Sequence, residues 1–167
     1  MPAIPELPAS PGAPAAPPEG RFLTRAPLDL APLLAAVADP ACGAQAVFLG
    51  TVRNHNDGRQ VVAIDYSAYP TMAERVLQRI VHELERATPD LRVVLRHRIG
   101  ELAVGEAAIA IVAASPRRDG ALGAIRAALE RVKAEAPIWK REIYADGSTG
   151  WREIEPLAPR PPEPGAG

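Results

Sequence analysis

The spacing of apolar residues predicts three helices. The first covers residues 28–37, where Asp29 can cap the first turn, and the second, at 71–88, opens with Thr71 and Glu74, a capping-box pattern. The third helix covers residues 119–135. The predicted inward residues of the first helix are Leu30, Leu33, Leu34 and Val37. Those of the second are Met72, Val76, Ile80, Val81 and Leu84, and those of the third are Leu122, Ile125, Leu129 and Val132. Each helix therefore has one face to bury.

Shorter apolar runs predict strands, which cover residues 43–52, 61–69, 92–99, 107–114 and 138–144. The run 107–114 is continuously apolar, which is typical of a central strand. Residues 92–99 alternate, with a basic stripe that we expect to be solvated, and 138–144 reads as an edge or return strand. The polar segment 53–60 contains Asp57-Gly58, a turn signal, so we expect the first two strands to form a hairpin. Residues 100–106 read as turns.

Together these elements predict an α+β fold with a largely antiparallel sheet, in a single folded domain over residues 21–155. Twelve of the 19 prolines lie in residues 1–20 and 156–167. We expect both ends to be disordered, proline-rich tails.

Composition excludes several classes of function. The net charge of −1 argues against bulk binding of nucleic acid, and three histidines at no ligand spacing predict no metal site. The single cysteine, Cys42, cannot form an internal disulfide and is typical of a small buried residue. The sequence has neither a secretory signal pattern nor an apolar run that approaches the ~20 residues of a membrane span, so we expect a cytoplasmic protein.

Lysine is rare in this chain. Of its 19 lysine and arginine residues only Lys133 and Lys140 are lysines. An ammonium group can lose its proton when it is desolvated and can then act as a base or a nucleophile, whereas a guanidinium stays charged. Codon bias is the alternative explanation. Lys133 falls at the edge of the third helix's apolar stripe, and Lys140 lies on the strand after Pro137, so the two amines can meet.

The segment 115–120, Ser-Pro-Arg-Arg-Asp-Gly, ends the central strand just before a helix. Two arginines beside free helix amides can bind an anion such as phosphate, although a solvated polar turn fits this segment equally well. The sequence has no glycine-rich dinucleotide motif, no phosphate loop and no serine nucleophile elbow.

Four segments in this order closely resemble the large, catalytic subunit of molybdopterin synthase, over about residues 22–153. They are residues 43–56, with Arg53-Asn54-His55-Asn56; residues 97–102, with Arg98-Ile99-Gly100-Glu101; residues 115–118; and residues 133–142, Lys-Ala-Glu-Ala-Pro-Ile-Trp-Lys-Arg-Glu. The combination is specific, while each segment alone would be weak.

This resemblance implies an α/β hammerhead-like fold with an antiparallel sheet subdomain and a sulfurtransferase of molybdenum cofactor biosynthesis. The implied substrate is cyclic pyranopterin monophosphate, which becomes molybdopterin when two sulfurs are inserted. The sulfur comes from the C-terminal Gly-Gly thiocarboxylate of a small ubiquitin-like partner subunit. The family assembles as a homodimer of large subunits with a small subunit at each end, a heterotetramer, and no cofactor is implied.

The resemblance also implies roles for particular residues. Lys133 and Lys140 are the catalytic pair, and our hypothesis is that Lys133 is the principal acid/base or acyl-contacting group and Lys140 its partner on the following strand. A cationic pocket can lower the pKa of a lysine toward neutrality. The substrate-binding positions are Thr51, Val52, Arg53, His55, Arg117, Arg118, Arg141 and Glu142. One departure is that the family usually has His-Arg where this chain has Arg117-Arg118. The alternative is a phosphate- or nucleotide-binding module, or a degenerate complex-forming homologue, in which the lysines only bind.

Overall fold

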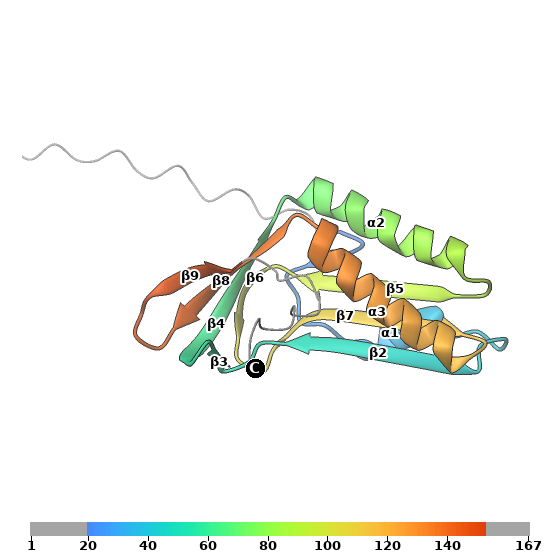
Figure 1. Cartoon of the computed structure of the whole chain (residues 1–167), viewed down its shortest axis with the longest axis horizontal. Coiled ribbons are helices and arrows are strands. Elements are labelled where there is room, and N and C mark those ends of the chain that lie inside the picture. Colours follow the sequence, from blue (N-terminus) through green and yellow to red (C-terminus); the bar gives the residue numbers. More distant parts are fainter. Residues whose placement is uncertain (1–19, 153–167) are drawn as a thin grey trace, which may run out of the picture.

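The computed structural model describes residues 20–152, in which two sheets stand side by side (Figure 1). The first sheet has four strands in the order β1 (Leu23–Thr24), β5 (Arg92–Arg98), β7 (Ala107–Ser115) and β2 (Ala44–Thr51). The second has β3 (His55–Asn56), β4 (Arg59–Ala68), β8 (Ile138–Tyr144) and β9 (Thr149–Arg152), with β6 (Gly100–Ala103) paired to β4. The pairs are antiparallel except β1 with β5. The predicted α+β class is therefore confirmed.

Strand β7 is central in the first sheet, and its residues from Ala108 to Ser115 are all buried. Alternate residues face opposite sides: Ile111 packs in the core beneath the two long helices, α2 (Pro70–Ala87) and α3 (Arg118–Glu135), whereas Val112 packs beneath α1 (Leu30–Val37). Burial of each such side chain contributes roughly 1.5–3 kcal/mol. Helices on both faces explain why the run is apolar without alternation.

The start of α1 is as predicted, because Asp29 Oδ1 accepts a hydrogen bond from the Ala31 amide at 3.0 Å. The predicted capping box of α2 is wrong. That helix begins at Pro70, which needs no N–H partner at the first helical position, and its cap residue, Tyr69, makes no side-chain cap bond. The Glu74 carboxylate instead accepts the amides of Phe22 (3.0 Å) and Leu23 (2.7 Å), which holds the start of the described chain against α2.

The buried faces of the long helices use smaller residues than predicted. In α2 the fully buried residues include Ala73 and Leu77, while Met72 is 57% exposed. In α3 the buried residues are Ala121, Ala124, Ala128 and Val132, and Leu122 is 59% exposed. Small side chains let a helix lie close to the sheet, so the predicted inward positions of Met72 and Leu122 are wrong.

The predicted hairpin between residues 43–52 and 61–69 is also wrong, although its turn is correct. Asp57 and Gly58 have positive φ (48° and 72°), as a two-residue hairpin turn requires, but they join β3 to β4. Strand β2 pairs with β7 in the first sheet, whereas β4 lies in the second. The chain leaves one sheet for the other between residues 52 and 55.

Three further expectations need correction. Residues 100–103, expected as turns, form β6 against β4. Strand β8 is not an edge, because it pairs with both β4 and β9. The basic stripe on β5 is not wholly solvated: Arg98 is 7% exposed and its Nη1 lies 2.9 Å from Glu106 Oε1.

The predicted tails lie outside the described residues, apart from Gly20, and so does the predicted end of the domain at 155. None of the helices described is both long and apolar enough to cross a membrane. Cys42 is half-buried and has a free thiol.

Candidate functional site

Strand β8 places Lys140 and Glu142 on one face of the second sheet, because residues two apart on a strand share a face. Lys140 lies opposite Tyr66 on β4 and Arg152 on β9, so all three side chains start from the same face. Arg141, between the two, starts from the other face. The register in which β8 pairs with β4 and β9 therefore determines which charged side chains can contact one another.

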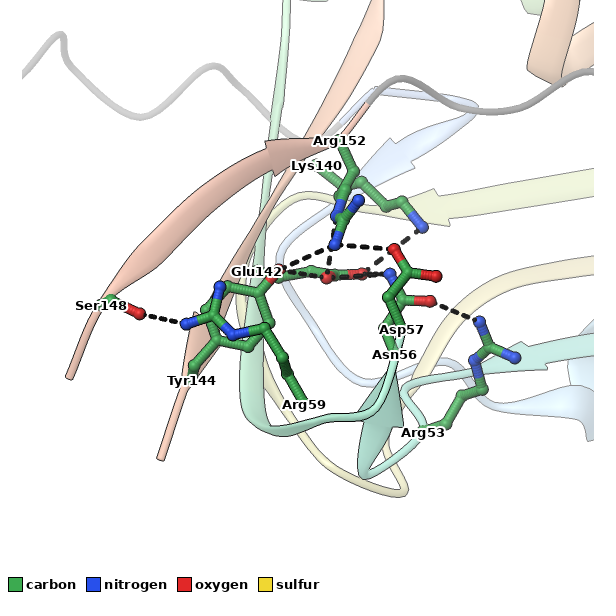
Figure 2. Close-up of polar contacts among 9 residues, drawn as sticks. All are labelled: Arg53, Asn56, Asp57, Arg59, Lys140, Glu142, Tyr144, Ser148 and Arg152. Carbon is green, nitrogen blue, oxygen red and sulfur yellow. Dashed lines mark hydrogen bonds and ion pairs between the residues drawn. The ribbon is translucent and has the colours of Figure 1, made fainter. Parts of the chain in front are cut away.

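Glu142 is the centre of a polar cluster (Figure 2). It is 2% exposed, and its carboxylate accepts hydrogen bonds from Asn56 Nδ2 (2.9 and 3.0 Å) and the Tyr144 hydroxyl (2.8 Å). Arg152 Nε lies at 3.4 Å and Lys140 Nζ at 3.9 Å. Burial acts to raise the pKa of this carboxyl, but the hydrogen bonds and cations outweigh it, so the pKa is lowered. Glu142 is thus a fixed negative charge.

The side chain of Lys140 is 27% exposed. Burial lowers its pKa, the charge of Glu142 opposes this, and the positive charges of Arg53, Lys133 and Arg152 lower it further. The net effect is a lowered pKa. Lys133 is half-buried in the last turn of α3, close enough for its charge to act on Lys140. Lys133 is therefore one of the charges that act on Lys140.

The segment after β2 brings Arg53 to this cluster. Val52 is buried, and its amide and carbonyl bond Glu106 O (3.0 Å) and the Gly105 amide (2.8 Å), so its side chain belongs to the core. Arg53 is exposed and donates from Nη2 to Asn56 Oδ1 at 3.1 Å. Thr51 and His55 are exposed on either side, and His55 Nδ1 lies 2.8 Å from Asn54 Oδ1.

Arg117 and Arg118 lie at the opposite end of α3. Arg117 is the cap residue, and Arg118 is 87% exposed, with Asp119 Oδ1 3.9 Å away. Since a helix rises 1.5 Å per residue, Arg118 and Lys133 are about 22 Å apart along the axis. Within one chain the predicted anion seat is therefore separate from the lysine pair.

Arg141 is also kept from the lysines. Its Nη2 lies 3.0 Å from Asp65 Oδ2, and its guanidinium sits 5.7 Å from the centre of the Trp151 ring. These contacts lie on the face of β8 away from Lys140.

Sequence reasoning missed Asn56, Tyr66, Tyr144 and Arg152. Asn56 could have been found, since it ends the Arg53-to-Asn56 motif. Burial, with the charge of Glu142, raises the pKa of Tyr66 to about 12, so Tyr66 stays neutral opposite Lys140. Tyr144 lies two residues from Glu142 on β8, so strand alternation could have signalled it, whereas Arg152 becomes a partner only through the pairing of β8 with β9.

The cluster can hold an anion. Arg53, Lys133, Lys140 and Arg152 outnumber the carboxylates of Glu142 and Asp57, the latter 2.9 Å from Arg152 Nη2. Lys140 adds a titratable amine. A hollow of about 300 Å³ is remote from this cluster, where β5 begins, and it carries the carboxylates of Asp39, Glu85 and Asp90. Among residues 20–152 no group of His, Cys, Asp and Glu is placed to hold a metal ion.

Comparison with known proteins gives consistent matches. Residues 23–135 match the family model described as MoaE protein. A molybdopterin synthase catalytic subunit from Nostoc sp. is 43% identical over 133 residues, 79% of this chain and 81% of that protein. One from Drosophila willistoni is 38% identical over 141 residues, 83% of this chain. The match spans only 38% of the length of the Drosophila protein.

Solved structures agree on the fold. Molybdopterin synthase from Staphylococcus aureus superposes with a TM-score of 0.75 at 33% identity, over 78% of this chain and 95% of that chain. A complex of subunits 1 and 2 of molybdopterin-converting factor from Helicobacter pylori gives 0.64 at 21% identity, over 79% and 89%. At that lower identity the likeness speaks for the fold alone.

Proposed function

The chain belongs to the MoaE family, and from this premise we propose that it is the catalytic subunit of a molybdopterin synthase, a sulfur-transferring enzyme of molybdenum cofactor biosynthesis. The family that the sequence predicted is thereby confirmed. The observation that carries the activity is the desolvated Lys140 beside Lys133, in a cluster where cations exceed carboxylates.

We propose that the substrate is cyclic pyranopterin monophosphate and that the sulfur donor is the C-terminal thiocarboxylate of a small ubiquitin-like subunit. Both reactants are anions, which the charges of Arg53, Lys133, Lys140 and Arg152 suit. The Helicobacter pylori structure, which shares the fold of this chain, is a complex of two subunits of molybdopterin-converting factor.

In the proposed mechanism the two lysines divide the work. Lys140, whose pKa is lowered, is the group that exchanges protons with the reacting groups. Lys133 holds the acyl end of the sulfur donor by its positive charge. Glu142 accepts hydrogen bonds on both oxygens and so holds the cluster in place. The positively charged side chains remain available to bind the reactants.

We further propose that a second copy of the chain completes each pocket. Arg117 and Arg118 lie about 22 Å from Lys133 along α3, too far to share one small substrate within a chain. Their side chains are exposed, so a dimer can bring them to the lysines of the other copy.

Reconstitution tests this function. The full chain is mixed with thiocarboxylated small subunit and cyclic pyranopterin monophosphate, and the dithiolene product is measured. We expect product from the unaltered chain and a loss of at least about a thousandfold in Lys133→Ala and in Lys140→Ala, with circular dichroism unchanged.

Lys133→Arg and Lys140→Arg are the matched controls, because they keep the charge and remove the titratable amine. Both should still bind the small subunit and both should lose turnover. Near-normal turnover in the alanine variants would refute the catalytic roles. Binding without any turnover in the unaltered chain would instead favour a non-catalytic, complex-forming homologue.

A further inference from the structure

A single amide joins Arg53 to the carboxylate at the centre of the cluster. Asn56 Oδ1 accepts from Arg53 Nη2 at 3.1 Å, while Asn56 Nδ2 donates to Glu142 Oε1 at 2.9 Å and Oε2 at 3.0 Å (Figure 2). Glu142 in turn faces Lys140 Nζ at 3.9 Å. The chain of contacts thus runs from a substrate-binding arginine to a catalytic lysine.

The chemistry of the two neighbours fixes the orientation of this amide. A guanidinium can only donate hydrogen bonds and an ionised carboxylate can only accept them. The reverse orientation would set an NH₂ group against Arg53 and a carbonyl oxygen against Glu142. A short side chain that accepts on one side and donates on the other meets both needs, which aspartate cannot do.

The hairpin that carries Asn56 is held at further points. Asp57 Oδ2 lies 2.9 Å from Arg152 Nη2, and the Arg59 guanidinium stacks 3.5 Å from the centre of the Tyr144 ring. The turn itself uses the left-handed conformation at Asp57 and Gly58. The β3–β4 hairpin is therefore fastened to β8 and β9, and Arg53 is held next to it through Asn56.

We propose that Asn56 is a positioning residue, whose amide holds Arg53 beside Lys140 and orients Glu142 toward the same amine. Its amide is engaged by Arg53 and Glu142, so it acts through these two side chains. Its effect on turnover rests on the proposed function, but its effect on the environment of Lys140 does not.

The two lysines make a direct test possible, because a ¹³C-lysine label gives only two side-chain signals in this chain. Lys133→Arg assigns them, and a pH titration then follows the Lys140 signal. The charged groups that act on Lys140 are Glu142, Arg53, Lys133 and Arg152.

In Asn56→Asp we expect Lys140 to titrate at higher pH than in the unaltered protein. The new carboxylate adds negative charge near the amine, and its repulsion from Glu142 loosens the hairpin and admits water; both effects raise the pKa of Lys140. Asn56→Ala releases both Arg53, whose charge lowers the pKa of Lys140, and Glu142, whose charge raises it, so we expect a smaller shift than in Asn56→Asp.

Gln60→Glu is the matched control. It replaces an amide with a carboxylate on the same hairpin, at an exposed position opposite His55, so its side chain starts from the other face. We expect its Lys140 titration to be unchanged. An unchanged Lys140 titration in both Asn56 variants, with their folded state verified by circular dichroism, would overturn the proposal.

Steady-state kinetics then measure the effect of the Asn56 substitutions on turnover. Asn56→Ala should raise KM and lower kcat by about tenfold each, and its effect on KM should disappear in an Arg53→Ala background, because a residue that acts through Arg53 has nothing left to hold. Full additivity of the two substitutions would overturn the link to Arg53. If no variant and no unaltered protein makes product, the proposed function fails, while the titration still decides the role of Asn56.

Discussion

The two ends of helix α3 carry positive charge in contrasting ways. Near its C-terminal end Lys133 is half-buried, and Lys140 on β8 lies 3.9 Å from a carboxylate that is 2% exposed and has several partners. At its N-terminal end Arg117 and Arg118 are exposed, and Arg118 has an acidic neighbour only at 3.9 Å. The lysine end is fixed by its own chain. The arginine end has a geometry that only a bound molecule or another chain can fix.

The largest expected effect would come from restoring activity across chains. Lys140→Ala and the double variant Arg117→Ala/Arg118→Ala should each be inactive alone. Refolded together, they should recover about one quarter of unaltered activity, because half of the dimers are mixed and each mixed dimer has one intact pocket.

The control is the same mixture made from Lys133→Ala and Lys140→Ala, whose defects share one end of α3. No mixed dimer of these two has an intact lysine pair, so this mixture should stay inactive. If the first mixture also stays inactive while dimers form, the arginines and lysines do not share a pocket between chains.

Next in size is the loss of stability when the centre of the lysine end is removed. Glu142→Ala should lower the free energy of unfolding by about 3–5 kcal/mol, because it leaves Asn56, Tyr144 and two cations without their buried acceptor. The measurement is urea denaturation. Asp119→Ala, the acidic partner at the exposed end, should change it by less than about 0.5 kcal/mol. Equal losses at the two ends would contradict the contrast.

The pH dependence of protein stability tests the contribution of Glu142 further. The pKa of Glu142 in the folded state is below its usual value of 4.5, so its stabilising contribution is present above that pH and is lost as the pH falls through the folded value. Glu142→Gln lacks this contribution. The difference in unfolding free energy between the two proteins should therefore be constant near neutrality and should narrow below about pH 4.5. A difference independent of pH would mean that Glu142 is not ionised in the fold.

The smallest effect concerns the departure at Arg117. If Arg117 only binds anion, Arg117→His should leave turnover within about threefold at acidic pH, where histidine is charged, and should add a limb to the pH–rate profile near pH 6.5. Stability should not change, since Arg117 is exposed. A large gain in turnover at neutral pH would show that a histidine here serves as an acid or base.

Several local features could be read directly from the chain. The Asp29 cap, the Asp57-Gly58 turn and the buried run at 107–114 are decided by neighbouring residues, and each is confirmed. The capping box at Thr71 failed because Pro70 can start a helix without it and Glu74 bonds to a distant segment. The predicted inward positions of Met72 and Leu122 are wrong because α2 and α3 bury alanines where they lie closest to other elements.

For the site, the sequence supplied the family motifs and the rarity of lysine, and so it singled out Lys133, Lys140 and Arg53. It could not supply their surroundings. Asn56 is 86 residues from Glu142 in the chain, and Arg152 joins the cluster only through the pairing of β8 with β9. The same pairing turns Arg141, a neighbour of Lys140 in sequence, toward Asp65 on the other face.

The sequence by itself determined which residues carry charge, where the local turns fall and to which family the chain belongs, because these depend on residue identity and short spacing. Only the tertiary structure decided that β2 and β4 part into different sheets and that Glu142 is buried among cations. The helix length between the arginines and Lys133 was already set by the helix predicted at 119–135. Burial and charge depend on distances through space, which strand register and helix packing set.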